Sequence, residues 1–280
     1  PKVFNDLYTN MVAAGEAGGI LDTILQRLAA YIEKAVKLNS QVKSAMIYPV
    51  AVISIACIVV AVILWKVIPV FAALFKGLGA ELPAPTRVVI ALSNFIADFW
   101  WLMTLVIVAS VFSIRRYHAT YKGRRVLDAI LLKIPVLGML LRKIAVARFC
   151  RTLATLTSSG VPILDGLAIT ARTAGNAIVE DSIMATRKSV EEGKTISEPL
   201  GDTEVFPPMV VQMIAVGEQT GALDTMLSKI ADFYEDEVDT AVAGLMKLLE
   251  PVLIAFLGVA IGGIVIAMYM PMFTLIGQIG

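Results

Sequence analysis

Side chains that could carry out covalent or metal chemistry are few in this chain of 280 residues. Its only histidine, His118, follows closely on two arginines, so a histidine-based metal site or a serine–histidine pair would rest on one residue. The two cysteines, Cys57 and Cys150, have no metal-ligand spacing and are interpreted as small buried apolar residues. The sequence therefore predicts no catalytic residue, no cofactor and no metal.

Nucleotide and nucleic-acid chemistry find no support either. No loop of the form Gly-x-x-x-x-Gly-Lys-Ser/Thr occurs, so the sequence lacks the usual phosphate-binding loop of nucleotide-binding proteins. The 24 basic and 23 acidic side chains leave a net charge of +1, so no overall field favours nucleic acid. Energy for any mechanical work must therefore come from a partner. The charged residues are expected to contact other parts of the protein, a partner or lipid.

Two turns of the form Gly-Glu-x-x-Gly hold the first candidate residues. Each turn ends a short helix before a long one, where a carboxylate can accept hydrogen bonds from free backbone N–H groups. A partner contact is the alternative role. The candidate turn-forming or partner-contact residues are Glu16, Gly19, Glu218, Gly221 and, at a predicted membrane border, Glu250.

A basic group precedes the second of these turns. It comprises Arg142, Lys143, Arg148 and Arg151. Such a group could dock an acidic protein surface, such as that of an ATPase, or anionic lipid headgroups, and lipid is the favoured interpretation.

The elements that must position these residues are helices, and three of them are apolar over a length that can cross a bilayer. Hydrophobic residues make up 58% of the chain and charged residues 17%, which is more apolar than a soluble domain needs. No charge occurs from Ser44 to Trp65 or from Pro251 onward, and Asp98 is the only one from Val88 to Ile114. The predicted transmembrane helices are 46–75, 95–114 and 251–280.

The flanks of these helices predict their orientation. Five basic residues follow the second span within residues 115–125, whereas the connector 76–94 holds two basic residues and one acidic residue. Because basic flanks stay in the cytoplasm, residues 1–45 and 115–250 are predicted inside, and the connector and the C-terminus outside.

The chain also contains one unit twice. Residues 4–78 align without a gap on residues 206–280, so that Gly19 falls on Gly221 and Pro49 on Pro251. Proline has no N–H donor, so Pro49 and Pro251 are predicted to kink the helices where they enter the bilayer. Residues 141–205 have no counterpart before the first copy, which is therefore expected to lack its upstream part.

The corresponding long helices carry opposite charges. Lys34 and Lys37 lie on the first, and the second carries an acidic group made of Asp232, Glu235, Asp236, Glu237 and Asp239. This group is typical of a solvated face, and the alternative is that the opposite charges set the pairing of two units or two protomers.

The order of these motifs resembles the PilC/GspF family of inner-membrane platform proteins, from type IV pilus assembly or type II secretion. The resemblance rests on the Gly-Glu-x-x-Gly-x-Leu turns at 15–21 and 217–223, on Leu-x-x-Ser-Gly-Val-Pro-Ile at 156–163, and on the membrane entries at Pro49 and Pro251. It covers essentially the whole chain. It implies an all-α polytopic membrane protein with two repeated cytoplasmic helical-bundle units and three transmembrane helices.

The resemblance also implies a domain order. Residues 1–45 would be the remnant of a first cytoplasmic bundle, and 115–250 a second, six-helix bundle. The spans 46–75, 95–114 and 251–280 would lie in the bacterial inner membrane, with 76–94 as a periplasmic connector.

The same resemblance also implies a set of partners. They are a cytoplasmic hexameric assembly ATPase, pilin or pseudopilin subunits, inner-membrane alignment proteins, membrane lipid and further copies in a homodimer or larger homo-oligomer. The expected function is to couple the ATPase to insertion or removal of pilin at the fibre base.

Two alternatives remain at this stage. One is the platform of a type II secretion system, and the other is a small membrane transporter, because repeats are common in that class. The near absence of ionisable residues in the spans weighs against a transporter.

Overall fold

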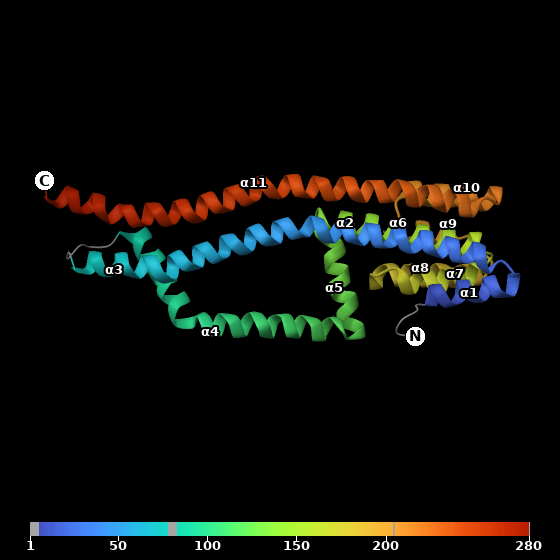
Figure 1. Cartoon of the computed structure of the whole chain (residues 1–280), viewed down its shortest axis with the longest axis horizontal. Helices are drawn as coiled ribbons and strands as arrows, with labels where there is room; N and C mark the ends of the chain where they lie inside the picture. Colours follow the sequence, from blue (N-terminus) through green and yellow to red (C-terminus); the bar gives the residue numbers. More distant parts are fainter. Residues whose placement is uncertain (1–5, 78–82, 204, 280) are drawn as a thin grey trace. The chain divides into compact units, whose positions relative to one another are not determined.

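The structure is a computed structural model that describes residues 6–77, 83–203 and 205–279 (Figure 1). Within these ranges the chain forms helices and short connections without a strand, which confirms the all-α prediction. In chain order the helices are α1 Asp6–Gly18, α2 Leu21–Val62, η1 Ile63–Val67, α3 Ile68–Gly77, α4 Ala84–His118, α5 Tyr121–Lys133, α6 Leu137–Ser158, α7 Ile163–Thr173, α8 Ala177–Glu191, α9 Ser197–Gly201, α10 Pro208–Thr220 and α11 Leu223–Ile279.

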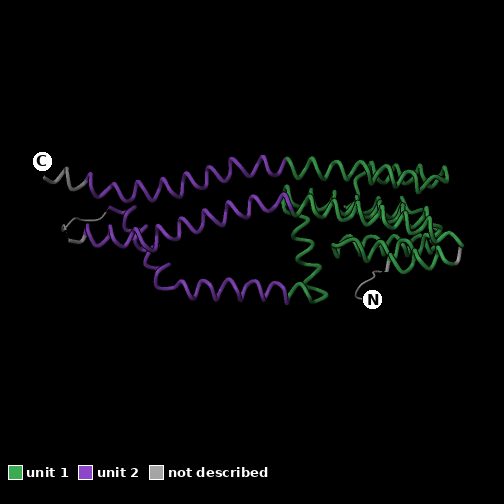
Figure 2. Tube along the Cα trace, viewed as in Figure 1, with its two compact units in different colours: residues 1–43, 117–243 green, residues 44–116, 244–280 purple. Residues whose placement is uncertain are grey.

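The chain divides into two compact units, coloured separately in Figure 2. Unit 1 contains residues 1–43 and 117–243, and unit 2 contains residues 44–116 and 244–280. Helices α2 and α11 each contribute residues to both units, since neither ends at a unit boundary. The start of the first repeat thus belongs to the same compact unit as residues 117–243.

Unit 1 is a helical bundle with a conventional apolar core. Phe149 of α6 is fully buried and meets Phe206 edge-on, with ring centroids 4.9 Å apart. A second cluster joins the start of the first repeat to the rest of the bundle, because α1 and α2 pack against α6 and α7 there. Its buried members are Leu7, Met11, Ile24, Leu28, Leu156, Val161 and Ile169.

The two Gly-Glu-x-x-Gly turns have the same geometry. Gly19 and Gly221 have φ angles of +67° and +69°, a left-handed conformation that glycine adopts without cost and that ends a helix. Gly15 and Gly217, four residues earlier, are closely approached by the first turn of the following helix. The two copies of the sequence repeat therefore have the same backbone conformation at this turn.

Unit 2 contains the apolar parts of three helices that are long and apolar enough to cross a membrane. These helices are residues 21–75, 84–118 and 223–273, which bears out the prediction of three membrane-spanning helices. Helix α4 begins at Ala84, so residues 84–94 of the predicted connector are helical, and residues 78–82 of it lie outside the described residues. Helix α4 also bends at Phe99, whose φ and ψ of −114° and 16° are not helical (Figure 1).

The prolines of the repeats lie inside helices. Helix α2 continues through Pro49, and α11 continues through Pro251 and Pro271. A bend at Pro49 and Pro251 stays a prediction. At Pro69 the backbone does change, because the preceding turn, Ile63–Val67, is a π-helix in which Ile68 N–H donates to the carbonyl of Ile63.

Candidate functional site: charged contacts of the bundle

A network of ion pairs joins α2, α6 and α11 within unit 1, and we call its four members Lys34, Arg151, Asp232 and Glu235 the charged seam. Lys34 Nζ donates to Asp232 Oδ1 at 2.7 Å, and Arg151 Nε donates to Glu235 Oε1 at 2.7 Å. Arg151 also donates to Asp232, so that this carboxylate holds two cations. The Arg151 side chain is only 12% exposed, whereas that of Asp232 is 55% exposed.

The seam shifts the pKa values of its members in the direction that keeps them charged. Partial burial of Asp232 favours its neutral form, but hydrogen bonds from Lys34 and Arg151 outweigh this and lower its pKa. Burial likewise opposes the charge of Arg151, yet hydrogen bonds to Glu235 and Asp232 raise its pKa. Both residues therefore remain ionised as a pair.

The register of the seam differs from that of the sequence repeat. By the repeat Lys34 corresponds to Asp236, but the structure pairs it with Asp232, one helical turn earlier. Gln41 is displaced in the same way, since it donates to Asp239 at 2.9 Å. Opposite charges on the two long helices therefore do meet, within one chain.

The predicted basic group is largely engaged by the protein itself. Lys143 pairs with Glu237 at 2.7 Å, Arg148 donates to the side chain of Asn39, and Arg151 belongs to the seam. Arg142 is half-buried on α6. Replacing Arg142 would therefore disturb the fewest of these contacts.

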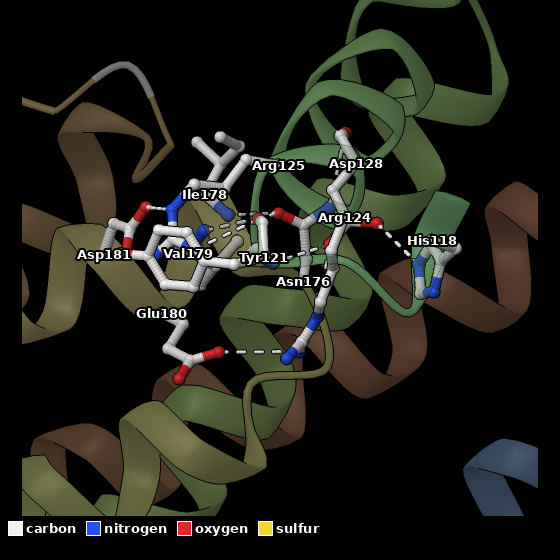
Figure 3. Close-up of polar contacts among 11 residues, drawn as sticks. His118, Tyr121, Arg124, Arg125, Asp128, Asn176, Ile178, Val179, Glu180 and Asp181 are labelled. Carbon is white, nitrogen blue, oxygen red and sulfur yellow. Dashed lines mark hydrogen bonds and ion pairs between the residues drawn. The ribbon is translucent and has the colours of Figure 1, made fainter. Parts of the chain in front are cut away.

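A second polar cluster, the α5–α8 joint, holds α5 against the start of α8 (Figure 3). The buried carboxylate of Asp128 accepts a hydrogen bond from the Ala177 N–H at 2.7 Å and lies 3.4 Å from His118 Nε2. Asn176 caps α8, because its Oδ1 accepts from the N–H groups of Ile178 and Val179. The cluster lies where α4 ends and the chain enters the bundle.

Two arginines extend the α5–α8 joint to the surface. Arg125 binds Asp181 with two hydrogen bonds, from Nε at 2.7 Å and from a terminal nitrogen at 2.5 Å, and lies over the Tyr121 ring (Figure 3). Hydrogen bonding to Asp181 raises the pKa of Arg125. Arg124 reaches Glu180 at 3.4 Å. Both arginines are on α5, and both carboxylates are on α8.

The turn carboxylates lie in different surroundings. Glu218 accepts hydrogen bonds from the Ile196 N–H at 2.5 Å and from the N–H and hydroxyl of Ser197, so it binds the start of α9 rather than that of α11. Glu16 and Glu250 are exposed. Pro49 is buried and Pro251 is exposed.

A cleft of about 460 Å³ lies beside the seam, lined by Arg27, Asp224 and Ser228 among others. In the described part of the chain no three metal-ligating side chains converge. Burial raises the pKa of Cys150, which makes its thiol unreactive.

Several residues of these clusters escaped the sequence analysis. Asn176 carried a usable signal, since an asparagine after a glycine and before an apolar helix is typical of an N-cap. Asp128 and Arg125 carried none, because they meet their partners Ala177 and Asp181 across about fifty residues of sequence. Such pairings depend on how the helices pack.

Together these features define a class: an all-α membrane protein that contains the same helical unit twice and has three helices long and apolar enough to cross a membrane. The chain belongs to the family of type II secretion system (T2SS) protein F, whose sequence model matches residues 1–69 and 149–271. The two matched segments end at Pro69 and Pro271, which are equivalent prolines of the repeat.

Relatives whose names are known match all or nearly all of the chain. A type IV pilus assembly protein PilC from Myxococcus xanthus is 55% identical over all of this chain and 67% of its own length. The PilC of Thermus thermophilus is 49% identical over 99% of this chain and 69% of its own length. A type II secretion system protein F from Vibrio cholerae is 37% identical over 97% of this chain and 67% of its own length.

Proposed function

We propose that this chain is the inner-membrane platform of a type IV pilus assembly machine. The observation that carries the proposal is the level of similarity, since relatives named for pilus assembly include two that are 55% and 49% identical, whereas two named for type II secretion are 37% and 36% identical. In this proposal unit 1 faces the cytoplasm and the C-terminus faces the periplasm, as the basic flanks suggest.

The platform would couple a cytoplasmic assembly ATPase to the insertion or removal of pilin subunits at the fibre base. The sequence has no phosphate-binding loop, so the energy comes from that partner. Helices α2 and α11 support transmission of motion from the ATPase, because each has residues in unit 1 and in unit 2. Alignment proteins, lipid and further copies of the chain complete the proposed assembly.

The proposed ATPase contact lies on the bundle near the basic group, for which lipid is the alternative partner. Lys143 and Arg151 already pair with carboxylates, so their loss would also weaken the fold. Arg142→Glu avoids those pairs, and Lys194→Glu on an exposed loop is a matched control. Binding of the ATPase to the detergent-solubilised full-length protein should fall with the first variant and persist with the second. Equal binding by both variants would remove Arg142 from the interface.

The second candidate is the platform of a type II secretion system, which the 37% identity to the Vibrio cholerae protein favours. Genetic complementation separates the two functions. The full-length gene should restore surface pili to a strain that lacks its PilC and should not restore enzyme secretion to a strain that lacks its protein F. The reverse result would make secretion the function, and failure of both would reject the platform proposal.

A further inference from the structure

Two proline residues of unit 2 leave backbone carbonyls without their helical donor, and the first is at Pro69. In an α-helix the carbonyl of Leu64 would accept from the N–H of Ile68, but that N–H donates to Ile63 in the π-turn. The next possible donor, residue 69, is proline and has no N–H. The Leu64 carbonyl instead accepts a hydrogen bond from the hydroxyl of Ser93 on α4.

The second carbonyl belongs to the equivalent end of the second repeat. The α-helical donor for Ala267 would be the N–H of residue 271, which is again a proline. The hydroxyl of Thr86, also on α4, donates to the Ala267 carbonyl at 2.5 Å. At each of the two proline sites, a hydroxyl from the same third helix, α4, therefore donates the hydrogen bond that the carbonyl lacks.

Both hydroxyls are placed where water cannot substitute for them. Ser93 is 0% exposed and Thr86 is 4% exposed. Leu64, Ile68 and Ile264 form an apolar cluster against which Val89 and Ile90 of α4 pack, and Thr86 lines a small apolar cavity with Ile68, Val89 and Ile90. A carbonyl that loses its donor in such apolar surroundings has no alternative partner, which costs free energy.

Other hydroxyls of the same unit behave differently. Ser54 and Thr104 donate to the carbonyl four residues earlier in their own helices, which is the usual choice in an apolar helix. Thr86 and Ser93 donate across to another helix. They also lie in a segment that belongs to neither copy of the repeat, between the two stretches that match the family.

We infer that Thr86 and Ser93 act as a pair of latches, positioning residues by which α4 holds the two proline-interrupted spanning helices in register. The latch is made only while α4 packs against both helices, because each carbonyl depends on a donor from α4. The inference goes beyond the proposed function and does not depend on it, since it requires only that unit 2 lies in a membrane. It explains why two hydroxyls stand in an apolar packing site.

A double-mutant cycle tests the latch in the full-length protein reconstituted in lipid nanodiscs, with thermal unfolding as the readout. Ser93→Ala and Thr86→Ala should each lower Tm by roughly 2–4 °C, the effect expected for one interhelical hydrogen bond. Ser54→Ala and Thr104→Ala are matched controls and should shift Tm by clearly less. The carbonyls that these hydroxyls contact keep their backbone N–H donors within their own helices.

The decisive part of the experiment replaces each proline with alanine, which restores a backbone N–H at that position. In a Pro69→Ala background the Leu64 carbonyl regains a backbone donor, so Ser93→Ala should lower Tm by less than half of its effect in the protein that retains Pro69. The same holds for Thr86→Ala in a Pro271→Ala background. An unchanged Ser93→Ala effect in the Pro69→Ala background, or effects no larger than those of the controls, would overturn the latch.

A third comparison covers the case in which the alanine-for-proline variants do not fold. Thr86→Ser keeps the hydroxyl and should retain the original Tm more closely than Thr86→Val, which keeps the shape and loses the donor. Equal Tm values for the serine and valine variants would show that the hydroxyl does not matter, and would also overturn the inference.

Discussion

The two units use apolar side chains in opposite ways. In unit 1 an apolar core lies inside, as Phe149 does with no exposed surface, and many of the charged pairs have at least one partly exposed member. In unit 2 many of the large apolar residues point outward, as Val259 does with 78% of its surface exposed. The difference shows that water drives the packing of the bundle, whereas unit 2 presents its apolar surface to lipid.

The polar contacts of the two units differ for the same reason. The seam and the α5–α8 joint use charges, several of them partly exposed, so each surface pair contributes little by itself. The interhelical bonds of unit 2 are neutral hydroxyl–carbonyl bonds in buried positions. Unit 2 therefore combines apolar packing with a few neutral interhelical bonds, whereas the bundle combines an apolar core with charged pairs.

The largest effect that should separate the units comes from the core of the bundle. Phe149→Ala removes a fully buried ring and its contact with Phe206, and should lower the free energy of unfolding of the bundle by about 3–5 kcal/mol. Phe233→Ala, at a 48% exposed position, should cost far less. Denaturant unfolding followed by circular dichroism measures both, and equal losses would contradict the assigned core.

A charge on the outward surface should distinguish lipid from water. Val259→Arg in unit 2 should oppose membrane insertion by about 2.5–3.5 kcal/mol, because the cation would enter hydrocarbon. Val36→Arg, at a 60% exposed position in unit 1, should insert and fold normally. Membrane fractionation compares the two variants. Normal insertion of the Val259→Arg variant would show that this surface does not face lipid.

A charge removed from the bundle interior should have the next effect. Asp128→Asn weakens the bonds to the Ala177 N–H and to His118, and should cost about 1.5–3 kcal/mol, the range for a hydrogen bond to a charged group. Asp181→Asn, on the exposed side of the α5–α8 joint, is the control and should cost less. Chemical unfolding that ranks the two variants in the opposite order would argue against the buried role of Asp128.

The repeated turns should respond alike to one substitution. Gly221→Ala and Gly19→Ala each place a side chain in a left-handed conformation, at a cost of about 1–2 kcal/mol. Gly244→Ala is the matched control, because Gly244 is helical and has open space around it, and it should be neutral or stabilising. Thermal unfolding tests the series; a cost at Gly221 without one at Gly19 would break the equivalence of the repeats.

The smallest expected effect concerns pH. The pKa of Asp232 is lowered in the folded state, so its contribution is present above the unfolded pKa of about 3.9 and is lost as pH falls through the folded pKa. The pair is partly exposed, so the contribution is about 0.2–1 kcal/mol. Asp232→Asn should have a lower Tm at neutral pH, and the gap should close in acid. A gap independent of pH would contradict the ionic role.

Sequence reasoning reached the fold through local signals. The uncharged runs predicted the three long apolar helices, and the repeated glycines predicted the turns at Gly19 and Gly221. It reached the site only in part, because a charged residue in a sequence does not reveal its partner. Arg151 was interpreted as a lipid or protein contact, and the structure shows it in the seam with Asp232 and Glu235.

By itself the sequence determined the elements, since helix formation, apolar length and glycine turns depend on residues a few positions apart. Only the tertiary structure decided which distant groups meet: Lys34 with Asp232, Asp128 with the start of α8, and the hydroxyls of α4 with the carbonyls freed by Pro69 and Pro271. These contacts depend on the packing of whole helices, and a shift of one turn, as between Asp236 and Asp232, changes the partner without changing the pattern.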